Sequence, residues 1–205
     1  MHRRADTDLE VLLRQARSGS AAARGELLAC YWNYLTLLAR LQLGRRLWAR
    51  IDSAELVEET LRQAQRRFAR FQGDTEVELV GWLRGILAAN LARLLRRYRG
   101  TQRCGLDLAG QMALDLDQSS RTLHQTGAAS QSAPRPQSVR RDASVLLVDA
   151  LQCLPDDYRE VIILRQLEGL PFWAVARRLG RPLESVKTLW IRALDRLHGA
   201  LRDIP

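Results

Sequence analysis

Lysine, histidine and cysteine are all scarce in this chain of 205 residues. Lys187 stands alone against 31 arginines, and the three histidines and three cysteines lie far apart, with no CxxC pair among them. A metal site or a disulfide framework is therefore not expected. No glycine-rich phosphate loop is present, and none of His2, His124 and His198 lies in an arrangement typical of catalytic sites. The sequence thus predicts no enzyme, no metal and no cofactor.

Long apolar runs are missing too. The longest apolar stretch, residues 27–41, is interrupted by Asn33 and Arg40, and no apolar segment follows residues 1–4. We therefore expect no membrane insertion, no secretory signal and a cytoplasmic location.

Positive charge, in contrast, is abundant. The formal net charge of +9 favours a polyanionic partner, of which nucleic acid is the obvious candidate. The preference for arginine over lysine is explained equally well by a GC-rich genome, so the positions of the charges have to decide. With 46% apolar residues, the chain is better sized for two small domains than for one large domain.

Helical periodicity dominates the chain, and no segment alternates apolar and polar residues as a strand does. Residues 7–99 keep a helical period with breaks at 18–20, near 44, at 52–53 and at 71–74, which predicts four helices. Thr75 and Glu78 have the spacing of a capping box at the start of the fourth helix. From residue 118 to residue 138 the composition turns to Ser, Gln and Pro, which predicts a flexible linker.

The last 35 residues have the outline of a helix-turn-helix. Val175, Ala176 and Leu179 mark a first packed helix, Gly180 ends it, and Pro182 opens the next helix. The second helix repeats apolar residues at helical spacing: Leu183, Val186, Trp190, Ala193, Leu194, Leu197 and Leu201. Its other side, which we expect to enter a DNA major groove, carries Glu184, Ser185, Lys187, Thr188, Ile191, Arg192 and Arg196.

Two further surfaces differ in charge. No acidic residue occurs from Leu79 to Leu106, where Trp82 and Asn90 accompany a strip of arginines: Arg84, Arg93, Arg96, Arg97, Arg99 and Arg103. Such a strip can neutralise phosphates beside an unstacked base, although Trp82 taken alone is more often a core residue. Before it, Asp52, Glu55, Glu58 and Glu59 surround Leu56 and Val57, which suits a protein contact or simply a solvated helix face.

Together these segments resemble the extracytoplasmic-function (ECF) sigma factors of the bacterial sigma-70 family. AELVEETLRQAQRRFARFQG (54–73) resembles the helix that grips the clamp helices of the RNA polymerase β′ subunit. GWLRGILAANLARLLRRY (81–98) is similar to the helix that follows it at the minus-10 element. Residues 154–197 resemble the domain that reads the minus-35 element, including its Leu-Pro start and Glu-Gly-Leu joint.

The resemblance implies an all-α fold with a four-helix sigma region 2 domain (1–103), a flexible linker (104–143) and a sigma region 4 helix-turn-helix domain (144–205). Core polymerase would be bound by Glu55, Leu56, Val57, Glu58, Glu59 and Thr60. The minus-10 DNA would be held by Arg70, Phe71, Gln72, Asp74, Trp82, Asn90, Arg93, Arg96 and Arg97. The minus-35 DNA would be read by Arg181, Ser185, Lys187, Thr188 and Arg192.

The implied function is that of a sigma factor, which binds core RNA polymerase, recognises both promoter elements and promotes DNA melting. Its implied partners are the polymerase, through the β′ clamp helices and the β flap, and promoter DNA; whether an anti-sigma factor exists stays open. Leu189 stands where many members carry an arginine, so the promoter sequence does not follow from the resemblance. Two alternatives remain: a free-standing helix-turn-helix regulator and an inactive sigma-like decoy.

Overall fold

The computed structural model describes residues 5–48, 53–99, 108–129 and 142–203, and every regular element within these ranges is helical. The helices are α1 (Ala5–Arg17), α2 (Ala21–Ala29), α3 (Trp32–Trp48), α4 (Ser53–Arg67), α5 (Glu76–Arg99), α6 (Leu108–Ala129), α7 (Ala143–Gln152), α8 (Asp156–Ile162), α9 (Phe172–Leu179) and α10 (Leu183–Asp203), with two short turns of helix, η1 (Phe68–Arg70) and η3 (Ile163–Leu167). The predicted all-α fold class is confirmed.

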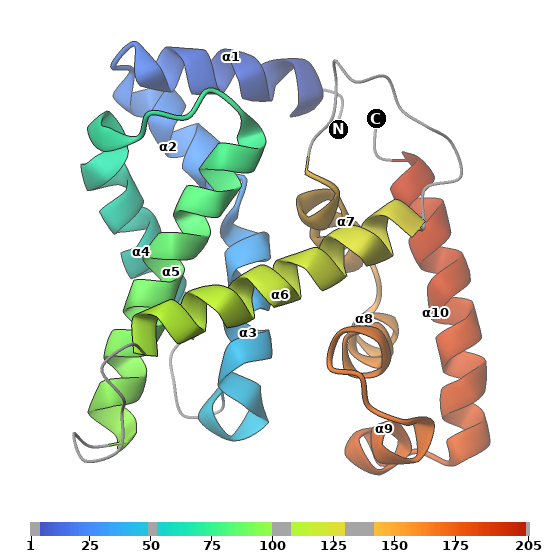
Figure 1. Ribbon diagram of the computed structural model, residues 1–205. Coiled ribbons are helices and arrows are strands. Elements are labelled where there is room, and N and C mark those ends of the chain that lie inside the picture. Colours follow the sequence, from blue (N-terminus) through green and yellow to red (C-terminus); the bar gives the residue numbers. More distant parts are fainter. Residues whose placement is uncertain (1–4, 49–52, 100–107, 130–141, 204–205) are drawn as a thin grey trace.

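Helices α1 to α5 form one group and α7 to α10 a second (Figure 1). The prediction of four helices before residue 100 is wrong, because the described residues of this segment already form five. Gly44 lies inside α3, and the missed break falls between α2 and α3, where the N–H of Tyr31 bonds the carbonyl of Leu28 at 3.2 Å. No glycine or proline marks this break; the Tyr31 side chain is instead completely buried in the core.

The predicted capping box at the start of α5 is confirmed. The N–H of Glu78 donates to the Thr75 hydroxyl at 3.3 Å, and the Glu78 carboxylate accepts from the N–H of Thr75 at 3.0 Å. These reciprocal bonds satisfy two backbone donors that a helix start otherwise leaves unpaired. Hydrogen bonds from the Thr75 hydroxyl and backbone hold the pKa of Glu78 below its ordinary value.

The predicted helix-turn-helix is confirmed as α9 and α10. Gly180 ends α9 in the left-handed region, at φ +65°, which a residue with a side chain rarely adopts. The N–H of Arg181 then returns to the carbonyl of Ala176 at 3.1 Å and closes the turn. On the packed side of α10, Val186, Ala193, Leu197 and Leu201 are buried. Leu183 departs from the predicted pattern, because it is 39% exposed.

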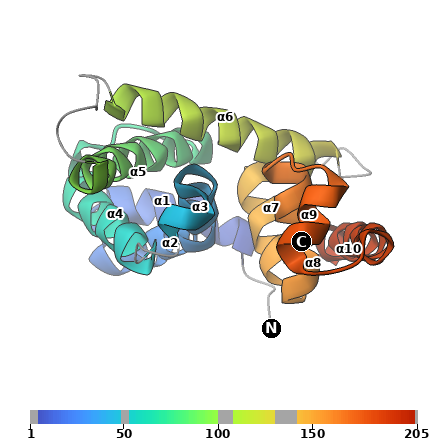
Figure 2. The ribbon, with the colours of Figure 1, turned by 90° about the horizontal axis from the view of Figure 1, so that it is seen from below.

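Helix α6 corrects the prediction of a flexible linker. Residues 108–129 form a helix of 22 residues that packs along α5 at one end and α7 at the other (Figures 1 and 2). Its polar composition hid a narrow apolar stripe, in which Met112 packs against the core and Leu116 and Leu123 are fully buried. These few apolar residues are enough to hold the helix in place, because both helical groups pack against them. The remaining predicted linker residues, 104–107 and 130–141, lie outside the described residues.

Candidate nucleic-acid interface

The outer side of α10 is open to solvent, as a groove-reading surface must be. All of its predicted members are exposed: Glu184, Ser185, Lys187, Thr188, Ile191, Arg192 and Arg196. The Lys187 ammonium lies 2.8 Å from the Glu184 carboxylate, one turn back on the same helix. Arg181, in the turn, forms an ion pair with Asp157 of α8. Arg181 and Lys187, two of the predicted DNA-reading side chains, are therefore each paired with a carboxylate that DNA would have to displace.

Two exposed apolar side chains were not among the five residues expected to read the minus-35 DNA. Ile191 on α10 and Trp173 on α9 are each 60% exposed, and the Arg177 guanidinium lies 5.3 Å from the Trp173 ring centroid. For Ile191 a signal existed, because helical spacing already put it on the outer side with Lys187 and Thr188. An apolar side chain in a recognition helix suits contact with the methyl group of thymine.

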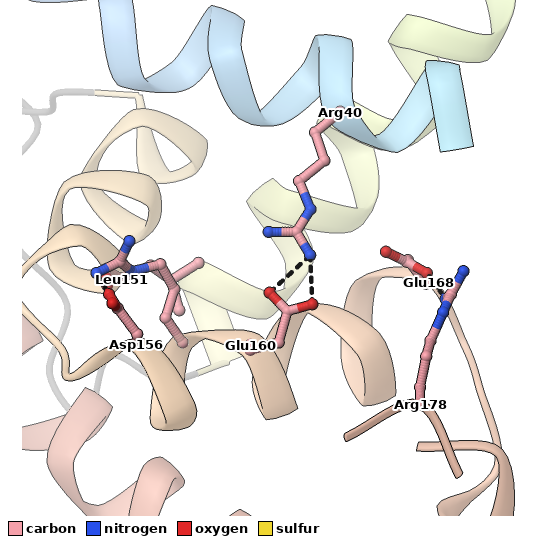
Figure 3. Close-up of polar contacts among 7 residues, drawn as sticks. Arg40, Leu151, Asp156, Glu160, Glu168 and Arg178 are labelled. Atoms are coloured by element: carbon pink, nitrogen blue, oxygen red, sulfur yellow. Dashed lines mark hydrogen bonds and ion pairs between the residues drawn. The ribbon is translucent and has the colours of Figure 1, made fainter. Parts of the chain in front are cut away.

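Helix α9 is fixed beneath the recognition helix by aromatic and ionic contacts. The Phe172 ring packs edge-on against Trp190 of α10, with centroids 6.2 Å apart, and the Arg165 guanidinium lies 4.9 Å from the Phe172 ring centroid. Arg178 of α9 is paired with Glu168, just after η3 (Figure 3). These contacts set the angle at which α10 leaves the turn, so they fix where the exposed side chains of α10 lie.

The basic strip lies on the last turns of α5. Arg93, Arg96 and Arg97 are exposed there, as phosphate contacts require. Arg84, nearer the start of the helix, is already engaged, because its Nε atom lies 2.9 Å from the Asp117 carboxylate of α6. The side chain of Arg99 and all of Arg103 lie outside the described residues.

Asn90, expected at the DNA, is instead buried between α4 and α5. Its amide donates to the Thr60 hydroxyl at 3.0 Å, and its carbonyl accepts from the Gln63 amide at 3.1 Å. The side chain is 4% exposed. A residue in this position stabilises the α4–α5 contact and presents no polar group to a ligand, so the structure gives Asn90 a structural place in the core.

The loop before α5 combines a buried aromatic cluster with exposed polar side chains. Phe71 is buried against Phe68 and a half-buried Trp82, with the Phe71 and Trp82 ring centroids 5.1 Å apart. Arg70, Gln72 and Asp74 are exposed, although Asp74 is ion-paired with Arg17 of α1. The aromatic rings therefore anchor the loop to the core, and its polar side chains face the solvent.

The predicted minus-10 residues thus fall into two clusters at opposite ends of α5. The loop cluster precedes Glu76, where the helix begins, and the arginine cluster starts at Arg93. Seventeen positions at 1.5 Å per residue separate them by about 25 Å. The resemblance assigned both clusters to the minus-10 element, and the structure places them at opposite ends of the helix.

On α4 the structure separates the predicted polymerase-binding residues into surface and core. Glu55 and Glu58 are exposed and Glu59 is partly exposed, while Leu56, Val57 and Thr60 are buried. The Glu59 carboxylate accepts hydrogen bonds from the Gln63 amide at 2.9 Å and from the Arg62 guanidinium at 2.5 Å. Both bonds lower the pKa of Glu59, and the bond from Gln63 has the larger effect. Only the carboxylates are open to a partner; the aliphatic residues between them hold α4 in the core.

Other kinds of site find no support in the described part of the chain. No cluster of His, Cys, Asp and Glu side chains within it has the geometry of a metal site. None of the described helices combines the length and the apolar character that a membrane crossing requires.

Comparison with known proteins bears on the same segments. Residues 144–197, which contain α7 to α9 and most of α10, match the family described as Sigma-70, region 4. The ECF RNA polymerase sigma-E factor of Haemophilus influenzae is 23% identical over 195 residues, a match that covers 95% of this chain and 96% of that protein. Over most of its length, this chain is therefore similar to an ECF sigma factor.

The sequence also matches a chain in the solved structure of an RsbN-BldN complex, at 21% identity and a TM-score of 0.30, over 90% of this chain and 96% of that one. The match to region 4 covers α9 and the first part of α10, so the helix-turn-helix lies within the segment that is similar to sigma-70 proteins.

Proposed function

We propose that this protein is an ECF sigma factor, which binds core RNA polymerase through α4 and directs it to promoters by holding the minus-10 element on α5 and reading the minus-35 element with α10. The observation that carries the proposal is the exposed, charged outer side of α10 within a complete helix-turn-helix. Phosphoryl transfer would belong entirely to the polymerase.

The minus-35 readers in this proposal are Arg181, Ser185, Lys187, Thr188 and Arg192. Their side chains lie on one exposed surface that starts at the turn and continues for about three helical turns. A bidentate contact between such a side chain and the correct base contributes about 1 to 3 kcal/mol of discrimination. Ile191, on the same surface, adds an apolar contact that favours thymine.

The minus-10 element would lie along α5. The distance of about 25 Å between the polar loop and the arginine cluster corresponds to about seven nucleotides at 3.4 Å each. We propose that Arg93, Arg96 and Arg97 contact phosphates, while Arg70, Gln72 and Asp74 face bases that leave the stack during melting. Asn90 acts indirectly, by holding α4 against α5.

On α4, the exposed carboxylates Glu55, Glu58 and Glu59 would meet a basic surface of the polymerase β′ clamp helices, with the β flap bound by the second helical group. Complementary charge of this kind sets the orientation and the rate of association more than the final affinity. An anti-sigma factor as a further partner remains a proposal without a surface assigned to it.

The test is transcription in vitro with core polymerase on fragmented genomic DNA, with start sites mapped. Protein-dependent starts that share two upstream motifs are expected. The Lys187→Ala/Arg192→Ala variant should lose these starts, whereas a control that also removes two exposed positive charges, Arg14→Ala/Arg202→Ala, should keep them. If starts are absent and the chain binds DNA by itself, a free-standing regulator replaces this proposal. If the Lys187 and Arg192 variant still initiates, the groove-reading surface is wrongly assigned.

A further inference from the structure

The loop that would hold the minus-10 DNA carries more negative than positive charge. From Arg70 to Glu78, one arginine stands against three carboxylates, those of Asp74, Glu76 and Glu78. Acidic residues favour the start of α5, because the N-terminal end of a helix carries partial positive charge. The same carboxylates would repel the phosphates of a DNA strand at this place. A DNA-binding loop of this sequence therefore needs each negative charge to be offset.

Two of the three carboxylates are engaged by uncharged groups. Glu78 accepts from the Thr75 hydroxyl at 2.7 Å and from the Thr75 N–H at 3.0 Å. Glu76 is partly buried, and it accepts from the Tyr31 hydroxyl at 3.1 Å and from the N–H of Asp142 at 2.7 Å. Both carboxylates are therefore tied to neighbouring groups of the protein by hydrogen bonds.

The third carboxylate, that of Asp74, faces the solvent and is neutralised by a distant arginine. Its side chain is 77% exposed and forms an ion pair with Arg17, in the last turn of α1, which is 39% exposed. Helix α1 lies beside the connection between α4 and α5 (Figure 1). Neither the sequence pattern nor the family resemblance gave Arg17 a role. The pair thus adds a residue of α1 to the edge of the loop.

Arg17 reaches the loop from a well-fixed helix end. On the other side of α1, Leu9, Leu13 and Ala16 are buried in the core. Gly19 follows the helix in the left-handed region, at φ +102°, and its N–H bonds the carbonyl of Ala16 at 3.2 Å. A positive charge in the last turn is also favoured by the partial negative charge of the helix end. The position of Arg17 is therefore set by packing and backbone geometry.

We infer that Arg17 is a positioning residue for DNA at this loop: it cancels the charge of Asp74 and holds that carboxylate in place, so that a single-stranded minus-10 segment can lie against the loop. This inference rests on the proposed function. Without Arg17, a free carboxylate within about 7 Å of a phosphate would lower the affinity about three- to tenfold at low salt. Because salt screens exposed charges, this deficit should shrink as the salt concentration rises above about 0.1 M.

The experiment measures how tightly core polymerase loaded with full-length variants binds a mapped promoter whose minus-10 segment is single-stranded. Arg17→Ala should weaken binding about three- to tenfold at low salt, and Arg17→Lys should keep most of the affinity because it keeps the charge. Arg17→Ala/Asp74→Asn should bind like the parent chain, since both carry the same net charge at this place. The control is Arg14→Ala, which removes an exposed charge one turn earlier on α1 and should bind like the parent.

Asp74→Asn alone should bind at least as tightly as the parent chain; a loss would overturn the inference, because the carboxylate itself would then contact a base. A double variant as weak as Arg17→Ala would overturn it too, since Arg17 would then contact DNA directly. So would a deficit that is the same at low and high salt, which indicates a displaced loop. Thermal unfolding should shift by only a few degrees in each variant, because an exposed ion pair adds little to stability.

The same experiment separates this inference from the proposed function. If the parent chain forms a promoter complex with core polymerase and Arg17→Ala binds equally well, the inference alone fails. If the parent chain forms no promoter complex, the proposed function fails, and the inference falls with it.

Discussion

The side-chain amide of Asn90 on α5 donates to the hydroxyl of Thr60 on α4 across 3.0 Å, and both side chains are buried. The Thr60 hydroxyl in turn donates to the carbonyl of Leu56, one turn back on α4, at 2.8 Å. Sequence patterns and family resemblance assigned these two residues to two different surfaces, one for DNA and one for polymerase. The structure joins them in a single hydrogen-bonded contact that fixes α4 against α5.

Asn90→Ala should therefore destabilise the protein by about 1 to 3 kcal/mol, because Thr60 and Gln63 lose a buried partner. Thr60→Ala should cost a similar amount, and the double variant less than the sum of the two. Urea unfolding monitored by helical circular dichroism measures all three. Arg93→Ala, exposed on the same helix, should change stability by no more than about 0.5 kcal/mol while it weakens DNA binding. Independent, additive effects of Asn90 and Thr60 would contradict the shared contact.

Gly73→Ala should destabilise the loop before α5. A Cβ atom at this position would lie 2.5 Å from the Phe71 ring and 2.8 Å from the Cβ atom of Glu78, so the aromatic cluster or the helix start must move. A cost of about 1 to 3 kcal/mol is expected from such crowding. Gly85→Ala, in open space within α5, should instead stabilise by about 0.5 to 1 kcal/mol. Thermal unfolding of the two variants side by side tests the contrast; equal shifts would argue against the close approach.

The capping box predicts a cost for Thr75→Ala and a pH dependence for Glu78. Loss of the Thr75 cap should destabilise by about 1 kcal/mol. Because the pKa of Glu78 is lower in the folded state than in the unfolded state, its contribution is present above the ordinary glutamate pKa of about 4.3 and is lost as pH falls through the folded-state value. Glu78→Gln should remove that part of the acid sensitivity. Denaturant unfolding from neutral to acidic pH compares the two chains, and parallel curves would rule the contribution out.

Ile191 should contact the methyl group of a thymine in the minus-35 element. Replacing that thymine with uracil deletes one methyl group, worth about 0.8 kcal/mol or about fourfold in affinity when buried. The parent chain should show this loss at one promoter position, and Ile191→Ala should not. Holoenzyme binding to promoters with uracil at each thymine in turn provides the measurement, with the remaining positions as internal controls. A loss that persists in Ile191→Ala would place the methyl contact elsewhere.

The sequence by itself determined the features that depend on neighbours along the chain. The helical period, the Thr75–Glu78 cap and the turn at Gly180 are set by hydrogen bonds and backbone angles within a few residues, so their patterns could be read directly. The outer side of α10 was equally predictable, because one helical period separates it from the packed side. The family resemblance rested on these local patterns.

Only the tertiary structure decided what depends on distant segments. Residues 108–129 are too polar to predict as a packed helix, and they become one because α5 and α7 together cover Leu116 and Leu123. Asn90 moves from a presumed DNA contact to the core because Thr60, thirty positions earlier, supplies its partner. The Arg40–Glu160 pair, which joins residues 120 positions apart, has no trace in the local sequence. Burial and pairing are properties of surfaces that meet only after folding, and a one-dimensional pattern carries no record of which surfaces those are.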